Sequence, residues 1–338
     1  MTPRAFICGL SGTELSQDEG AFLRDAQPWG VILFKRNTDS PEQILRLCAA
    51  ARAALGWDAP ILIDQEGGRV QRFGAPHLRD YPAGSVYGRI YDVSPLAGTE
   101  AAFLGAKLIA LDLLALGINV DCLPMLDVPV EGGTPAIGDR ALGRTPDAVA
   151  TLGGAQLDGL LSGGVLPVMK HMPGHGRAIV DSHAELPRVD ATVAELEARD
   201  FLPFRLLAKR VPLGMTAHVV FSDIDDGAPA TLSPSVIVNV IRRRIGFDGA
   251  LMTDDISMGA LSGDVRNRGV GAIAAGCDLV LHCNGQIDEM LEIATSVPEL
   301  SGDALRRTDA ALACPRGGEE ADRAALEARF DALLARAA

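Results

Sequence analysis

The chain has 338 residues, and 48% of them are apolar, which is enough to bury the core of one large α/β domain or of two small ones. Its 44 acidic residues outnumber its 31 lysines and arginines, so the formal charge is −13. A surface of this charge repels nucleic acid and anionic membranes, and we expect neither as a partner.

The N-terminal residues and the cysteines favour a cytoplasmic protein. The segment from Met1 to Leu10 contains a brief apolar run but no signal-peptide pattern, and no apolar stretch has the length of a membrane span. The cysteines form no CxxC pairs, and a chain this long needs no disulfides: they are Cys8, Cys48, Cys122, Cys277, Cys283 and Cys314. We therefore expect reduced thiols and a cytoplasmic location.

Eight short runs rich in Val, Ile and Leu alternate with longer segments that carry helix-start signals, as in repeated β-α units. Each run is continuously apolar, as buried parallel strands are. The expected strands are Ala5–Cys8, Gly30–Phe34, Ile61–Asp64, Ile118–Asp121, Val165–Lys170, Leu213–Ala217, Ala250–Asp254 and Leu279–His282. Eight units without a glycine-rich nucleotide-binding fingerprint predict a closed (β/α)8 TIM-type barrel rather than an open doubly wound sheet.

Helix-start signals and the absence of linkers complete the domain prediction. Ser40 to Gln43 read as an N-cap, a proline in the first turn and a capping-box glutamine, and Thr192 with Glu195 forms a second capping box. No Pro- or Ser-rich stretch marks a second domain. We expect one catalytic barrel over residues 1–338, with a C-terminal amphipathic helix outside the barrel from about residue 319.

Polar residues stand at or directly after the ends of most of the expected strands. Any one of them could be a charged side chain leaving a buried strand for solvent. In a barrel, however, the carboxyl ends of all strands share one face, where catalytic groups gather. The rim residues are Lys35, Asp64, Asp121, Lys170, His171, His218, Asp254 and His282.

The loop after the fifth strand is rich in histidine. His171 and His175 have the spacing of a helical zinc pair, but Pro173 and the neighbouring glycines argue against a helix there. A metal-dependent hydrolase remains an alternative, with His171, His175, Asp181 and His183 as ligands. We favour a site without a metal.

The Asp181-Ser182-His183 segment of the same loop is a candidate acid/base dyad. The carboxylate of Asp181 can fix one nitrogen of His183 and leave the other nitrogen for proton transfer. Because glycines precede this segment, we expect loop closure about Gly174 and Gly176 to deliver His183 to the site.

The seventh expected strand ends in two adjacent carboxylates, Asp254 and Asp255. Neighbouring side chains on a strand point to opposite sides, so only one of the two can face the barrel axis. The strand pattern does not decide which.

Together these motifs resemble glycoside hydrolase family three, and within it the single-domain bacterial β-N-acetylglucosaminidases of peptidoglycan recycling. Their order and spacing match along nearly the whole chain. Met172 departs from the family pattern, which commonly has Phe there. The motifs are I-D-Q-E-G-G-R-V at 63–70, G-D-R at 138–140, K-H-M-P-G-H-G at 170–176, D-S-H at 181–183, M-T-A-H at 215–218 and T-D-D-I-S-M at 253–258.

The resemblance implies roles for residues of this chain. Asp254 corresponds to the catalytic nucleophile and His183 to the acid/base, assisted by Asp181, while Asp255 is structural. Five further residues correspond to positions that hold the hydroxyls and the acetamido group of the terminal N-acetylglucosamine: Asp64, Arg72, Arg140, Lys170 and His171. The resemblance leaves Glu66, His175 and His218 without a role.

The implied reaction is retaining exo-hydrolysis of terminal N-acetylglucosamine from peptidoglycan-derived anhydro-muropeptides, through a covalent glycosyl-enzyme. It requires no metal and no organic cofactor. Phosphorolysis by the same nucleophile is a second alternative, and a sugar-binding protein without activity is disfavoured because Asp254, Asp181 and His183 are all present. Without coiled-coil heptads or an evident apolar strip, we expect a monomer.

Overall fold

Eight parallel strands close into a barrel in the order β1-β12-β11-β9-β7-β6-β3-β2, which confirms the predicted fold class. The computed structural model describes residues 2–315, 317 and 322–337. Every predicted strand overlaps an observed one. The barrel strands are β1 (Arg4–Gly9), β2 (Pro28–Leu33), β3 (Ile61–Ile63), β6 (Val120–Asp121), β7 (Leu166–Met172), β9 (Leu213–Thr216), β11 (Ala250–Asp255) and β12 (Leu279–His282).

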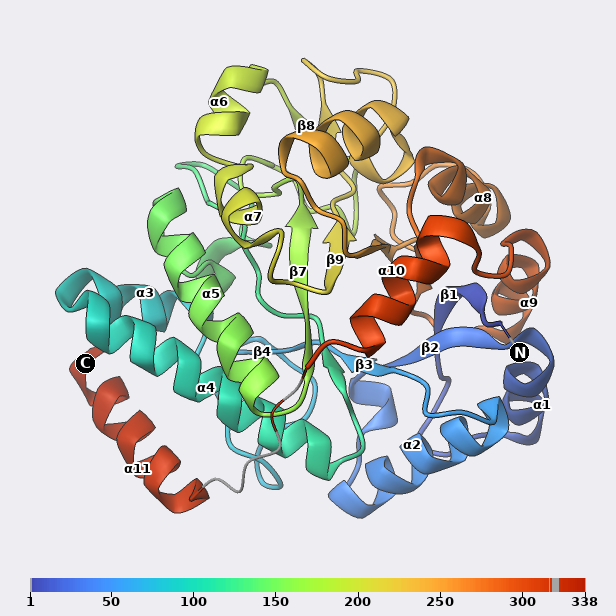
Figure 1. Cartoon of the computed structure of the whole chain (residues 1–338), viewed down its shortest axis with the longest axis horizontal. Coiled ribbons are helices and arrows are strands. Elements are labelled where there is room, and N and C mark those ends of the chain that lie inside the picture. Colours follow the sequence, from blue (N-terminus) through green and yellow to red (C-terminus); the bar gives the residue numbers. More distant parts are fainter. Residues whose placement is uncertain (1, 316, 318–321, 338) are drawn as a thin grey trace.

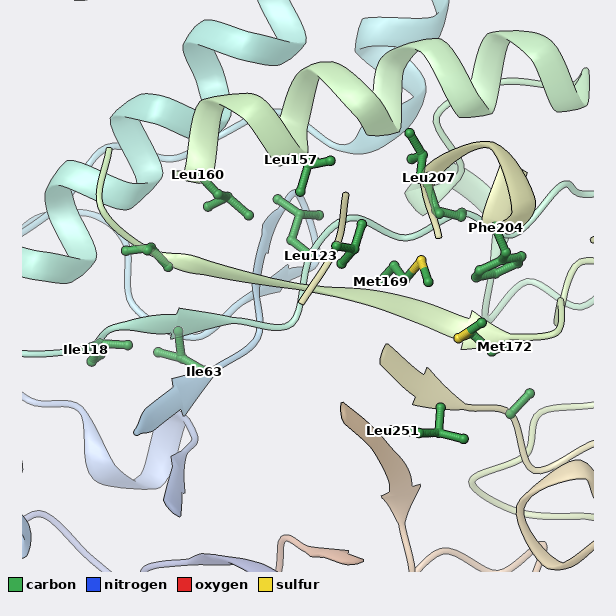
Figure 2. Close-up of a cluster of buried hydrophobic side chains, with 14 of the residues drawn as sticks. Ile63, Ile118, Leu123, Leu157, Leu160, Met169, Met172, Phe204, Leu207 and Leu251 are labelled. Carbon is green, nitrogen blue, oxygen red and sulfur yellow. The ribbon is translucent and has the colours of Figure 1, made fainter. Parts of the chain in front are cut away.

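The strands form because their apolar residues are buried on both sides of the barrel wall. Along β1, Phe6 and Cys8 belong to the cluster beneath the helices, whereas Ile7 belongs to a second cluster inside the barrel. This alternation follows from the two-residue period of a strand. Figure 2 shows part of the outer layer, where Met169 and Met172 of β7 lie among leucines and Phe204 from the covering helices.

Helices cover the outside of the barrel, with α4 and α5 packed side by side (Figure 1). The longer helices are α1 (Gln17–Ala26), α2 (Pro41–Leu55), α3 (Gly84–Val93), α4 (Pro95–Ala115), α5 (Pro146–Ser162), α8 (Val265–Ala275), α9 (Ile287–Ser296), α10 (Gly302–Leu312), α11 (Arg323–Leu334) and the π-helical η4 (Ser235–Arg244). The shorter ones are α6 (Val193–Ala198), α7 (Leu202–Leu207), η1 (Lys35–Asn37), η2 (Gly138–Arg140), η3 (Ala230–Leu232) and η5 (Ala335–Ala337).

The predicted helix starts are largely confirmed. Ser40 caps α2 by accepting from the N–H of Gln43, and Thr192 with Glu195 forms a capping box at α6. The side chain of Gln43 differs from the prediction, because its Oε1 accepts from the N–H of Asp39 rather than of Ser40. Two small sheets lie outside the barrel: β4 (Gln65–Gly67) with β5 (Val70–Gln71), and β8 (Arg188–Val189) with β10 (Val220–Phe221).

Helix α10 closes the amino end of the barrel. Ala311 of α10 and the preceding Leu300 are buried in the same cluster as Ala5, Trp29 and Ala250, which lie near the starts of strands. The barrel interior is therefore sealed by apolar side chains at this end. The polar residues predicted for the site lie at the opposite, carboxyl ends of the strands.

Helix α11 packs outside the barrel against α4 (Figure 1). Phe330 and Leu333 are buried there, and Arg323 forms an ion pair with Asp112 of α4 at 2.5 Å. The predicted start of this helix near residue 319 lies outside the described residues. Within the described ranges, no helix is both long enough and apolar enough to cross a membrane.

Candidate active site

A buried cluster of alternating charges occupies the carboxyl ends of β3 and β7. The Nζ of Lys170 lies 2.8 Å from Oδ1 of Asp64 and 2.7 Å from Oε1 of Glu66. Arg72 donates to the other oxygen of Asp64 at 3.0 Å. Arg140 donates to both oxygens of Glu66, at 2.9 and 2.7 Å. The structure thus brings four of the five predicted sugar-binding residues together around Lys170.

Electrostatics favour the charged forms of Asp64, Glu66 and Lys170 in this cluster. Burial alone would raise the pKa of Asp64, but the cations of Lys170 and Arg72 outweigh it and hold that pKa well below its usual range. Burial likewise opposes ionisation of Glu66, yet Lys170 and Arg140 lower its pKa to about 2. Burial disfavours the charged form of Lys170, and the two carboxylates reverse this and raise its pKa. Three cations and two anions therefore offer charged donors and acceptors to a polar ligand.

Glu66 is a member of this cluster that sequence reasoning left without a role. It is 5% exposed, and it lies two residues beyond Asp64 on the short strand β4. Its partner Arg140 is 74 residues away in the sequence, on η2. The signal in the sequence was the alternation of Asp64 and Glu66, which places both side chains on one face of an extended segment.

The structure distinguishes the two adjacent carboxylates at the end of β11. Asp255 accepts from the N–H and the hydroxyl of Ser257, at 3.0 and 2.6 Å, and from the N–H of Cys283 at 3.1 Å. Asp254 accepts only from the N–H of Asp255, at 2.8 Å, among the hydrogen bonds of the described residues. Its second oxygen lies 4.0 Å from Nε2 of His171. Asp254 is therefore the carboxylate with an oxygen available for chemistry.

Asp254 is ionised at neutral pH. Burial opposes the charge, but His171, His218 and the backbone N–H of Asp255 outweigh it and lower the pKa of Asp254 below its ordinary value. Lys170 contributes in the same direction. The charged cluster around Lys170 and the carboxylate of Asp254 thus influence each other electrostatically.

Asp127 orients His171 toward Asp254. Its Oδ2 lies 2.6 Å from Nδ1 of His171, and its Oδ1 accepts from the N–H of His175 at 2.6 Å. Burial raises the pKa of Asp127, but the two histidines lower it more, so the net shift is downward. Sequence reasoning missed Asp127, because its role depends on a contact with a residue 44 positions away.

The predicted dyad forms on a turn at the rim. Nδ1 of His183 lies 2.8 Å from Oδ1 of Asp181, which also accepts from the N–H of His183 at 3.0 Å. The two side chains are 71% and 48% exposed. Burial opposes ionisation of Asp181, but the contacts with His183 together outweigh it and lower the pKa of Asp181. Within the described residues, Nε2 of His183 makes no hydrogen bond and is not paired with Asp254.

The two glycines expected as hinges are tightly packed. A Cβ on Gly176 would clash with the carbonyl of Val128, and a Cβ on Gly174 would lie 3.0 Å from Cβ of Asp200. Gly174 also adopts a φ of 139°, which proline cannot reach. These glycines permit close approach of their neighbours in this conformation, and loop closure about them stays a prediction. The exposed part of the loop begins at Ile179.

Several predicted rim residues have structural partners instead. His218 uses both nitrogens, with Thr231 at 2.7 Å and the carbonyl of Asp255 at 3.0 Å. Asp121 accepts from the N–H of Gln65, and His282 contacts Glu289 at 2.7 Å. These interactions hold the loops around the site.

The structure does not gather the four ligands of the metal alternative. Among the described residues, no three His, Cys, Asp or Glu side chains are placed to hold a metal ion. His171 uses Nδ1 for Asp127, and His175 uses Nε2 for Ser182. Asp181 and His183 are paired with each other at the rim.

Residues 7–310 match the family model described as the glycosyl hydrolase family 3 N-terminal domain. The chain is 42% identical over 281 residues to a β-hexosaminidase of Alkalilimnicola ehrlichii, covering 82% of this chain and 80% of that protein. It also resembles NagZ from Neisseria gonorrhoeae in complex with N-trifluoroacetyl-D-glucosamine, with a TM-score of 0.89, 32% identity and coverage of 100% of this chain and 99% of the other. A zinc complex of that NagZ gives a TM-score of 0.88 at 31% identity, with the same coverage.

The closed barrel, the charged cluster at its carboxyl end and these matches define a glycoside hydrolase. The chain belongs to glycosyl hydrolase family 3. Its enzyme class is β-N-acetylhexosaminidase, which confirms the assignment made from the sequence motifs.

Proposed function

We propose that this protein is a retaining exo-β-N-acetylglucosaminidase with Asp254 as its nucleophile. The observation that carries the proposal is the pair of carboxylates on β11. Asp255 is committed to Ser257 and Cys283, whereas Asp254 keeps an open oxygen beside His171. A lowered pKa keeps that oxygen anionic and ready to attack an anomeric carbon.

In the proposed reaction, Oδ2 of Asp254 attacks the anomeric carbon while protonated His183 gives its Nε2 proton to the departing oxygen. Asp181 accepts the Nδ1–H of His183, so neutral His183 has its free lone pair on Nε2. That nitrogen then takes a proton from the water that attacks the glycosyl-enzyme. Two inversions give net retention, and Asp254 leaves as a carboxylate.

The charged cluster is the proposed site of the terminal sugar. Asp64 can accept protons from sugar hydroxyls, and Arg72, Lys170 and Arg140 can donate to hydroxyl or acetamido oxygens. His171 lies between this cluster and Asp254, with its Nε2 directed to the nucleophile. The complex of the related NagZ with an N-acylated glucosamine supports a site for this class of sugar.

We place the natural substrate among the anhydro-muropeptides of peptidoglycan recycling, as the family resemblance implies. We propose a monomer as the active unit. Cys8, Cys48, Cys122, Cys277 and Cys283 are buried free thiols, which suits the reducing cytoplasm. We propose no cofactor for the reaction.

The test is release of 4-nitrophenol from its β-N-acetylglucosaminide and its β-glucoside, with the sugar anomer followed by NMR. We expect cleavage of the first substrate only and the β-anomer as first product. Asp254→Asn should lower kcat by at least about 10³-fold with an unchanged fold. Asp255→Asn is the matched control, and we expect it to lower thermal stability while keeping far more activity than Asp254→Asn.

Two additions separate the alternatives. Phosphate that accelerates turnover and yields a sugar phosphate would identify phosphorolysis. Loss of activity in EDTA, restored by zinc, would instead indicate the metal-dependent reaction. Activity of Asp254→Asn close to that of the wild type would refute the proposed mechanism.

A further inference from the structure

Ser182 is the buried residue of an otherwise exposed turn. It is 4% exposed, whereas the flanking side chains of Asp181 and His183 are 48% and 71% exposed. The hydroxyl of Ser182 lies 3.1 Å from Nε2 of His175. Ser182 therefore provides a side-chain link between the turn that carries the dyad and the protein interior.

His175 is rigidly placed to hold Ser182. Its side chain is 3% exposed, and its backbone N–H donates to Asp127 at 2.6 Å. The His175 ring also packs edge-on against His171, with centroids 5.7 Å apart. Its Nδ1 is buried without a hydrogen-bond partner in the described part of the chain, so the contact with Ser182 is the polar interaction that orients the ring. Burial lowers the pKa of His175, which favours the neutral form of its ring.

A second set of bonds ties the same turn to the loop that follows Asp254. The N–H of Gly259 donates to the carbonyl of His183 at 3.2 Å, and the N–H of Ala260 donates to the carbonyl of Ser182 at 3.2 Å. A Cβ on Gly259 would lie 2.9 Å from the oxygen of His183 and 3.0 Å from that of Ala184. Only glycine lets the two backbones approach this closely without displacing the turn.

We propose that His175 is a positioning residue that fixes the acid/base dyad through its hydrogen bond to Ser182. A continuous series of contacts then links the open oxygen of Asp254 to the dyad, through His171, Asp127, His175 and Ser182. The inference rests on the proposed acid/base role of His183 and adds the element that places it. It also gives His175 a function that the sequence motifs left unassigned.

Loss of the hydrogen bond between His175 and Ser182 should affect proton transfer by His183 alone. A general acid must lie within hydrogen-bond reach of the leaving oxygen, and a misplacement of about 1 Å can cost on the order of 10²-fold in rate. The charged cluster around Lys170 does not contact Ser182, so its ion pairs should remain when His175 is replaced. Loss of the bond from His175 should therefore impair leaving-group protonation and spare sugar binding.

The experiment compares kcat/KM for 4-nitrophenyl β-N-acetylglucosaminide and for chitobiose, which report the glycosylation step. Nitrophenolate departs with little protonation, whereas the sugar hydroxyl of chitobiose must be protonated. We expect His175→Ala to lower kcat/KM for chitobiose by roughly 10- to 100-fold and to have a much smaller effect on the nitrophenyl substrate. His175→Gln, whose amide reaches the position of Nε2, should restore most of the loss.

A double-mutant cycle separates this inference from the proposed function. If His175 acts through the dyad, His175→Ala should cost little further activity in a His183→Ala background. Full activity of His183→Ala on chitobiose would overturn the proposed acid/base. The positioning role alone would be overturned by a different pattern, in which His183→Ala loses kcat/KM selectively for chitobiose but His175→Ala does not act through the dyad. In that case His175→Ala would lower kcat/KM equally for both substrates, or its loss would add fully to that of His183→Ala.

Two further variants cover a failure of folding. Gly259→Ala displaces the turn from the other side and should show the same selectivity for chitobiose if His175→Ala does not fold. His282→Ala is the matched control, because it also truncates a buried histidine with one polar partner, Glu289. We expect its effect on kcat/KM to be equal for the two substrates.

Discussion

The ammonium group of Lys170 lies 2.7 Å from Oε1 of Glu66, and both side chains are at most 5% exposed. Glu66 also holds the guanidinium of Arg140 through two bonds. One carboxylate thus fixes two of the cations proposed to hold the sugar, although it was assigned no contact with the sugar itself.

Glu66→Gln should weaken both the fold and sugar binding. Removing the negative charge leaves Arg140 without its ion-pair partner and Lys170 with Asp64 alone, and breaking a buried ion pair costs about 3–5 kcal/mol. We expect a loss of free energy of unfolding in this range, measured with urea. KM for the nitrophenyl N-acetylglucosaminide should rise about tenfold while kcat changes less.

The matched control is Asp139→Asn. Asp139 pairs with Arg69 at 2.8 Å, but the two side chains are 52% and 46% exposed. An exposed pair contributes about 0–1 kcal/mol, so stability and KM should stay close to the wild-type values. If the two substitutions had equal effects, the buried cluster would have no special role.

The same carboxylate predicts a pH dependence of stability. The folded state lowers the pKa of Glu66 from 4.5 to about 2, so its stabilising effect is complete above the unfolded value and disappears as the pH falls to the folded one. We expect the difference in free energy of unfolding between wild type and Glu66→Gln to shrink between pH 4.5 and about pH 2. Urea unfolding at several pH values measures it, and a constant difference would contradict the lowered pKa.

Helix α11 supports the loop that carries Asp64, Glu66 and Arg72 of the proposed sugar-binding cluster. Phe330 is fully buried against Tyr81 and Tyr87, and the backbone of Tyr81 bonds to Gly68 and Gln71 beside the cluster. Phe330→Ala should cost about 3–5 kcal/mol of stability. Because the loop loses its support, KM should also rise, which steady-state kinetics at a temperature where the variant stays folded would reveal. An unchanged KM would show that α11 stabilises the barrel without influencing the site.

The barrel was predictable because each strand is a continuous apolar run, and burial on both sides of the wall leaves few other structures for such runs. Asp64, Lys170 and Asp254 were predictable because they directly follow or end those runs. The strand pattern alone could not choose between Asp254 and Asp255, because that choice depends on the N–H of Cys283, 28 residues away; only the family resemblance favoured Asp254. The close packing of Gly174 and Gly176 against the side chain of Asp200 and the backbone of Val128 could not be read from the sequence, because it depends on contacts that only the fold creates.

Asp127 and His175 show the same limit for polar residues. Each makes its decisive contact with a side chain or backbone group that only the folded loop brings near. An aspartate or a histidine can serve catalysis, metal binding or structural hydrogen bonding. Only the distances to its neighbours in the folded protein distinguish these roles.

The seal that α10 forms beneath the strands has a consequence for the order of events. Because apolar side chains fill that end, we expect ligands to enter and leave the proposed active site at the carboxyl ends of the strands. The aglycone must depart there before water reaches the glycosyl-enzyme, and the freed sugar must then leave by the same route. We therefore expect product release by this route, and not only the chemistry at Asp254, to influence the rate of turnover.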